Sequence, residues 1–209
     1  MKKLLLFDFD GVLANSIDDI LINAKIASDS IGIRTEPTKK AVGSQNKMEF
    51  DVLGELIGIP RDRLPEFVDV ILGLFSGTVN IPKIFDGIPE MLFELRDNII
   101  CIVTANSENY VRNFSDHYDI SKYIERIYDR YYSAGKEVKF RAAMEAHEIS
   151  IDNVYVIGDA SSDITAAHNV NIKSIAVSWG FQDHGLLMMS RPDFIADSPD
   201  DIIKIVSNK

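Results

Sequence analysis

A short apolar run that ends abruptly in two acidic residues and a glycine constrains this chain more than any other feature. The run 4–7 is followed by Asp8, Phe9, Asp10 and Gly11. Such a run is typical of a buried strand, and side chains two apart on a strand share one face. Asp8 and Asp10 are therefore expected to point together beyond the strand's carboxyl end. Because like charges repel, the pattern favours a site that binds a divalent cation and performs nucleophilic or acid-base chemistry on a phosphoryl group.

The second half of the chain alternates apolar runs with helical patterns. The apolar runs are 99–103, 154–157 and 174–177, and helical patterns lie near 89–98, from about 107, near 136–148, from about 161 and from 199. This alternation predicts an α/β fold with a Rossmann-like, doubly wound parallel sheet, whose ligand lies beyond the carboxyl ends of the strands. Asp8, Thr104 and Asp159 each follow an apolar run at that end.

Between the first strand and this alternation, every pattern is helical. Helical spacing of apolar residues recurs over 17–31, 47–57 and 64–75. Ser16 is expected to cap the first of these helices, with Asp19 as its capping-box partner. The sequence therefore predicts a core domain formed by residues 1–15 and 83–209, and a small all-helical domain formed by residues 16–82.

Composition limits the partners. The net charge of -10, without any basic run, argues against nucleic-acid binding. The single cysteine, Cys101, excludes an internal disulfide and suits a reducing, cytoplasmic location. The first residues briefly resemble a signal peptide, but Asp8 and Asp10 interrupt the apolar region, and no run approaches the ~20 residues of a membrane span. We expect a cytoplasmic monomer or homodimer that acts on a small phosphorylated metabolite.

Four motifs in order resemble those of the haloacid dehalogenase superfamily in its phosphatase branch. Asp8-Phe9-Asp10-Gly11-Val12-Leu13 matches the first motif, and Ile102-Val103-Thr104-Ala105-Asn106 resembles the second. A lysine near 136 and the segment Val156-Ile157-Gly158-Asp159-Ala160-Ser161-Ser162-Asp163 resemble the third and fourth. The resemblance covers essentially the whole chain and implies that the helical block is a cap inserted after the first motif, as in members like phosphoglycolate phosphatase and β-phosphoglucomutase.

The resemblance also implies roles for the second and third motifs. Thr104, with Ala105 and Asn106, would hold the phosphoryl oxygens, although a threonine at a strand end is also a common helix cap. Lys136 or Lys139 would neutralise the phosphoryl group. Lys136, at the start of its helix, is favoured. Glu137-Val138 follows it where the best-known subfamily has proline, which weakens the close analogies.

The fourth motif completes the implied metal site. Asp159 would bind Mg²⁺ together with Asp8 and Asp10, the latter through its backbone carbonyl, and Asp163 would orient the metal's waters or the lysine. Taken alone, Asp159 and Asp163 could equally serve as a helix cap and a first-turn acid.

The implied reaction is hydrolysis of a phosphomonoester through an aspartyl phosphate on Asp8, with Asp10 as general acid and base. A sugar phosphomutase with the same core and a non-catalytic binding protein remain alternatives. A metal-free dehalogenase lacks the second aspartate, so Asp10 argues against it.

The segment 42–47 resembles the loop with which the family's caps read the leaving group. Gly43, which permits a tight turn there, and Lys47 are both expected to contact the substrate. The loop suits a small polar or anionic organophosphate but does not identify it.

Overall fold

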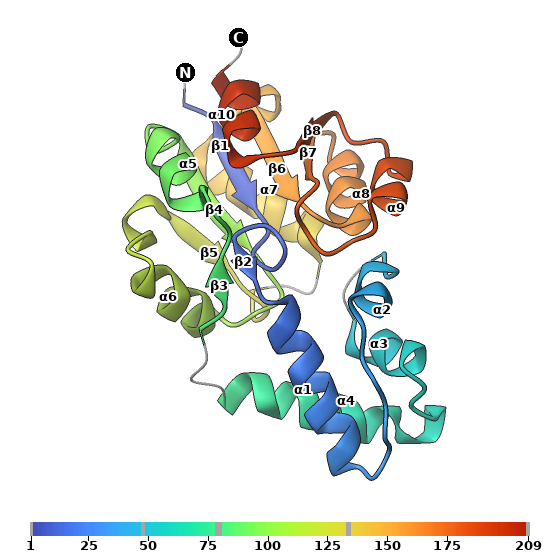
Figure 1. The fold of residues 1–209 in the computed structure, drawn as a ribbon. Helices are drawn as coiled ribbons and strands as arrows, with labels where there is room; N and C mark the ends of the chain where they lie inside the picture. Colours follow the sequence, from blue (N-terminus) through green and yellow to red (C-terminus); the bar gives the residue numbers. More distant parts are fainter. Residues whose placement is uncertain (1, 47–48, 78–80, 133–134, 208–209) are drawn as a thin grey trace.

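A computed structural model describes residues 2–46, 49–77, 81–132 and 135–207, which form an α/β core with a group of helices beside it (Figure 1). The core sheet has six parallel strands in the order β5-β4-β1-β6-β7-β8. These are β1 (Leu4–Phe7), β4 (Ile99–Val103), β5 (Arg126–Tyr128), β6 (Val154–Gly158), β7 (Lys173–Val177) and β8 (Phe194–Ala196). The predicted α/β fold class is thereby confirmed.

Helices cover both faces of the sheet because its central strands are apolar on both. One face packs against α5 (Ile88–Glu94), α6 (Glu108–His117) and α10 (Pro199–Ser207), and the other against α7 (Lys136–His147) and α8 (Ser161–Asn169). In β1, Leu5 and Phe7 face the first layer, and Leu4 and Leu6 face the second. All four are fully buried, so the central strand stays apolar until it ends at Asp8.

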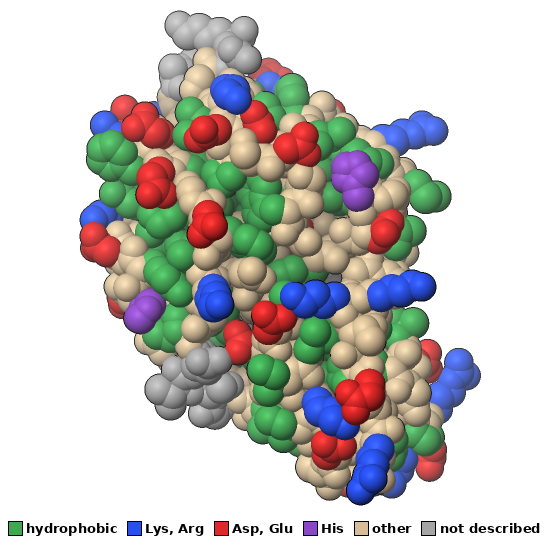
Figure 2. Space-filling model, in the orientation of Figure 1, with side chains coloured by type: hydrophobic (Ala, Val, Ile, Leu, Met, Phe, Trp, Pro, Cys, Tyr) green, Lys and Arg blue, Asp and Glu red, His purple; other side chains and the backbone are tan. Residues whose placement is uncertain are grey.

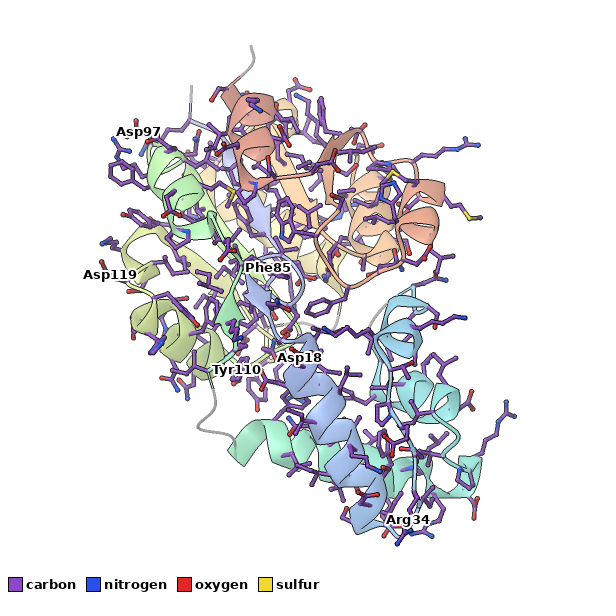
Figure 3. All side chains as sticks on the ribbon, viewed as in Figure 1. Asp18, Arg34, Phe85, Asp97, Tyr110 and Asp119 are labelled. Carbon is purple, nitrogen blue, oxygen red and sulfur yellow. The ribbon has the colours of Figure 1, made fainter. Side chains whose placement is uncertain are left out.

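Four further helices form the cap, which has a hydrophobic cluster of its own. They are α1 (Ile17–Ser30), α2 (Lys39–Gly43), α3 (Phe50–Leu56) and α4 (Leu64–Gly77), and α4 packs on both α1 and α3. The chain enters and leaves the cap through β2 (Ala14–Asn15) and β3 (Lys83–Ile84), which pair antiparallel. The cap lies at the end of the sheet toward which β1 runs (Figure 1). Figure 3 places Asp18 at the core end of α1 and Arg34 at the far end of the cap.

Several short elements were not predicted. The edge strands β5 and β8 have three residues each, too few for a period to emerge, and the same holds for β2 and β3. Two short helices, α2 and α9 (His184–Met189), were also missed. In the described part of the predicted helix 47–57, α3 begins at Phe50.

The surface agrees with the acidic composition. On the face shown in Figure 2, acidic side chains are dispersed over both the core and the cap. In the ranges that the structure describes, none of the helices combines the length and apolar character needed to cross a membrane.

Candidate active site

The candidate site lies where three neighbouring strands end. Asp8 follows β1, Thr104 follows β4 and Asp159 follows β6, and β1 lies between the other two strands. The backbone N–H of Asp8 still donates to the carbonyl of Ile157 at 2.8 Å. The hydrogen bonds of the sheet therefore fix the position of the first carboxylate.

Lys136 connects Asp8 to a second carboxylate. From the first turn of α7, its Nζ lies 2.9 Å from Asp8 Oδ2 and forms another ion pair with Asp163, which is buried on α8. Burial alone would lower the pKa of Lys136, but the Asp163 and Asp8 carboxylates outweigh it and hold that pKa above its usual range. Lys136 is therefore charged beside Asp8.

Lys139, the other candidate, points elsewhere. Its side chain is only 3% exposed, and Nζ donates to the backbone carbonyl of Thr104 at 2.8 Å. Of the two lysines, Lys136 is the one whose ammonium reaches Asp8. The structure thus distinguishes two residues that the sequence spacing left in competition.

Asp10 is held by uncharged donors. Ser16 Oγ donates to Asp10 Oδ1 at 2.6 Å, and Asn106 Nδ2 donates to Oδ2. Burial raises the pKa of Asp10 to about 6, and the Asp8 charge adds to this, while the hydrogen bonds from Ser16 and Asn106 oppose it. A carboxyl group with this pKa can both donate and accept a proton near neutral pH.

Ser16 occupies the N-cap position of α1, as predicted, but the predicted capping by its side chain is wrong. The side chain makes no capping hydrogen bond to the helix. A capping residue normally has an extended backbone, which aims its oxygen at the first helical N–H groups. Ser16 has φ -89° and ψ 7°, and its hydroxyl turns to Asp10 instead. The serine therefore belongs to the candidate site.

The second motif contributes a tight turn at the end of β4. The Thr104 hydroxyl accepts the backbone N–H of Asn106 at 3.0 Å and is buried, with the residue 1% exposed. Ala105 and Asn106 line the cleft above it. The three predicted residues therefore lie together, with the latter two facing the space where a ligand would bind.

Asp159 is almost completely buried, with 4% of the residue exposed. Its Oδ2 accepts the backbone N–H of Phe181 at 2.7 Å. A Cβ at Gly11, where φ is +77°, or at Gly180 would overlap its side chain. Burial raises the pKa of Asp159 well above its usual range, and the charges of Asp8 and Asp163 add to the shift. The two glycines thus make room for a carboxylate that is costly to ionise without a cation.

The donor set fits a hard divalent cation. Carboxylate oxygens of Asp8, Asp159 and Asp163 lie within 4.8 Å of one another. Mg²⁺ prefers a few carboxylate oxygens and retained waters. Asp163 already binds Lys136 and accepts the backbone N–H of Ala160, so Asp8 and Asp159 are the carboxylates best suited to direct coordination. The Asp10 carboxylate lies outside this cluster, turned toward its own donors.

The four aspartates and Lys136 lie at or beside a cavity of about 450 Å³ between the core and the cap. From the segment 42–47, which was predicted to read the leaving group, Val42 and Gln45 line the cavity. Gly43 lies against the core instead, where its carbonyl accepts the backbone N–H of Asp183 at 2.9 Å. Lys47, the other residue predicted to read the substrate, lies outside the described residues.

Gln182 fastens the cap loop to the core and was not predicted. Its amide donates to the carbonyl of Gln45, and its Oε1 accepts the backbone N–H of Ser161 at 2.7 Å. Beside it, the backbone N–H of Ser162 donates to the carbonyl of Asn46 at 3.1 Å. The sequence around Gln182 does not predict these hydrogen bonds, because the partners lie on two segments distant in the chain.

Comparisons with known proteins extend over nearly the whole chain. The model of the haloacid dehalogenase-like hydrolase family matches residues 5–177. A phosphoglycolate phosphatase from Vibrio parahaemolyticus is 24% identical over 219 residues, which covers 98% of this chain and 96% of that protein. A 5'-nucleotidase from Pseudomonas aeruginosa is 22% identical and covers 90% of this chain and 88% of its own length. The solved structure of a haloacid dehalogenase-like family hydrolase from Streptococcus pneumoniae superposes with a TM-score of 0.82 at 21% identity, covering 98% of both chains.

Proposed function

The chain belongs to the haloacid dehalogenase-like hydrolase family, and we propose that it is a Mg²⁺-dependent phosphatase that hydrolyses a small phosphomonoester through an aspartyl phosphate on Asp8. The names of its relatives, phosphoglycolate phosphatase and 5'-nucleotidase, support the phosphatase reaction. The buried carboxylates around Lys136 support the choice of cofactor.

One observation carries the proposal: two aspartates, two residues apart, are held by different kinds of partner. Asp8 forms an ion pair with Lys136, whereas Asp10 accepts hydrogen bonds from Ser16 and Asn106. A nucleophile must be charged, and a proton carrier must be able to change its charge. The ion pair keeps Asp8 charged, and the uncharged partners of Asp10 let that residue gain and lose a proton, so the pair meets both requirements.

The reaction then follows from the residues of the chain. A carboxylate oxygen of Asp8 attacks the phosphorus and displaces the alcohol, so that an O–P bond of an acyl phosphate forms as the bond to the leaving oxygen breaks. Asp10 gives its proton to that oxygen and next takes one from the water that hydrolyses the acyl phosphate, releasing phosphate and restoring both carboxyl groups. Lys136 neutralises charge throughout. Asp8, Asp159 and the Asp10 carbonyl would hold Mg²⁺, which would supply the positive charge that a dianionic phosphate needs to approach these carboxylates.

The direct test measures inorganic phosphate released from a panel of phosphomonoesters with Mg²⁺, with EDTA, and with Asp8→Asn. We expect release with Mg²⁺, its loss in EDTA, recovery when Mg²⁺ is restored, and no turnover by the variant. Full activity in EDTA with chloride release from a haloacid would replace the proposal with the dehalogenase reaction. An isomerised sugar phosphate without free phosphate would replace it with phosphate transfer, and an enzyme inert on the whole panel would refute it.

A further inference from the structure

We propose that the cap selects phosphomonoesters whose organic group is apolar and carries no second negative charge. This inference rests on the phosphatase function proposed above and names the substrate class of the same site. The proposed substrate class excludes phosphoglycolate, whose organic group is a short carboxylate.

Hydrocarbon side chains from all four cap helices form most of the cap wall of the cavity. These are Ile20, Val42, Phe50, Val68, Leu72 and Phe75. Phe181 continues this wall on the core side, directly after the glycine that packs on Asp159. A wall of this composition stabilises an organic group mainly by removing its apolar surface from water.

Two aromatic rings give the wall a fixed shape. Phe50 on α3 and Phe75 on α4 stack with their centroids 5.4 Å apart and their planes at 17°. Both are half-buried and also pack against the hydrophobic cluster of the cap. Their free surfaces therefore face the cavity as part of a supported surface, which favours a flat or extended apolar group over a hydrated one.

The cationic side chains among the described lining residues come from the core and not from the cap. Among the described lining residues, the cap contributes two charged side chains, and both are acidic: Glu49 and Asp51. The cations, Lys136 and Arg130, belong to the core, and the backbone N–H of Arg130 donates to the carbonyl of Asn106 at 3.0 Å. A carboxylate at the far end of a substrate would thus approach like charges and hydrocarbon, whereas the phosphate would approach cations.

The size of the cavity agrees with this assignment. At ~30 Å³ for each water-sized group, about 450 Å³ is far more than a phosphate with a short acid requires. An organic group long enough to reach Leu72 and Phe75 would fill the remaining space.

A series of straight-chain alkyl phosphates from ethyl to hexyl tests the proposal, because the acidity of the leaving alcohol hardly changes along it. We expect kcat/KM to rise about fourfold per methylene, the fold-change equivalent to burying one methylene at ~0.8 kcal/mol. Isobutyl phosphate, an apolar analogue of phosphoglycolate in shape, should be hydrolysed faster than phosphoglycolate itself. The better leaving group of phosphoglycolate works against this expectation, which makes the test stricter.

A pair of variants on α4 separates pocket contacts from general charge effects. Leu72→Lys places a cation in the cap wall and should flatten the alkyl series while raising kcat/KM for phosphoglycolate about tenfold, the scale of a charge-assisted hydrogen bond. Gly73→Lys adds the same charge one residue later, where a side chain meets open space, and should change neither.

The outcomes distinguish this inference from the function on which it rests. Phosphate release that is flat along the alkyl series, or fastest with phosphoglycolate, would overturn the substrate class while leaving the phosphatase intact. Absence of phosphate release from every substrate would overturn the phosphatase proposal and this inference with it.

Discussion

On the core side of the cavity, charged side chains are held by ion pairs and hydrogen bonds, whereas on the cap side hydrocarbon side chains extend from four separate helices. Lys136 has two carboxylate partners and Asp10 two hydrogen-bond donors. By contrast, the rings of Phe50 and Phe75 are positioned by stacking on each other and by packing against the hydrophobic cluster of the cap.

This difference separates two tasks. A network of ion pairs and hydrogen bonds tolerates little displacement, and the phosphoryl group is common to every phosphomonoester. Apolar contacts are non-directional and scale with area, so the cap wall can change its preferred organic group without disturbing the chemistry. We therefore expect core substitutions to affect all substrates equally and cap substitutions to affect substrates unequally.

The largest expected effect comes from Asp8→Asn. The amide is nearly isosteric but is a poor nucleophile, so kcat should fall by about 10⁴-fold or more with every phosphomonoester. Circular dichroism should report an intact fold. Turnover within tenfold of the wild type would remove Asp8 from its role and erase the distinction between core and cap.

Lys136→Met should lower kcat/KM by about 10²- to 10³-fold, again for all substrates, because a fixed charge beside the transferring group is lost. Lys139→Met provides the matched control on the same helix. It removes the hydrogen bond to the Thr104 carbonyl and should cost ~1–3 kcal/mol in the free energy of unfolding, while kcat/KM stays within about tenfold. The reverse ranking of the two variants would reassign the lysine.

Gly180→Ala tests the enclosure of Asp159. The added methyl group would displace the carboxylate, so the Mg²⁺ concentration for half-maximal activity should rise about 10- to 100-fold. At saturating Mg²⁺ the substrate preference should stay the same. Gly73→Ala, whose methyl group meets open space, is the control. An unchanged Mg²⁺ dependence would show that Asp159 is not a metal ligand.

The smallest expected effect comes from a substitution at the contact between the core and the cap. Gln182→Ala removes the side-chain link between the cap loop and the core, while the backbone hydrogen bonds of Ser162 and Asp183 remain. It should raise KM by about three- to tenfold with little change in kcat, the scale of one or two hydrogen bonds. Ser44→Ala removes a hydroxyl from the same loop that bonds only within it among the contacts described, and should leave KM unchanged. Equal effects of the two variants would mean that loop composition, not its attachment, sets KM.

The contrast between the halves also explains what the sequence could predict. Asp8 and Asp159 follow buried strands directly, and Asp10 lies two residues after Asp8. Because the carboxyl ends of parallel strands meet at one edge of the sheet, these residues could be expected there. Thr104 is similar. Such residues can be predicted from the sequence because the strand and the loop that follows it are contiguous in the chain.

Other features depend on contacts between distant segments. The side chain of Ser16 was expected to cap a helix, because Ser16 directly precedes a helical pattern. No local pattern reveals that its hydroxyl donates to Asp10 instead. Gln182 binds two segments far from it in the sequence. The apolar residues of α3 and α4 were recognised as helical, but periodicity cannot tell a side chain that fills the cap core from one such as Leu72 that lines the cavity.

Asp8 as nucleophile and Asp10 as proton carrier can be separated by a burst experiment with Asp10→Asn. An aryl phosphate with an acidic leaving group needs no proton from Asp10, so Asp8 should still be phosphorylated, whereas hydrolysis of the aspartyl phosphate should stall without the base. We expect a rapid release of about one equivalent of phenolate per enzyme, followed by turnover slowed about 10²- to 10⁴-fold. Steady turnover at the wild-type rate, or no burst at all, would contradict these roles of Asp8 and Asp10.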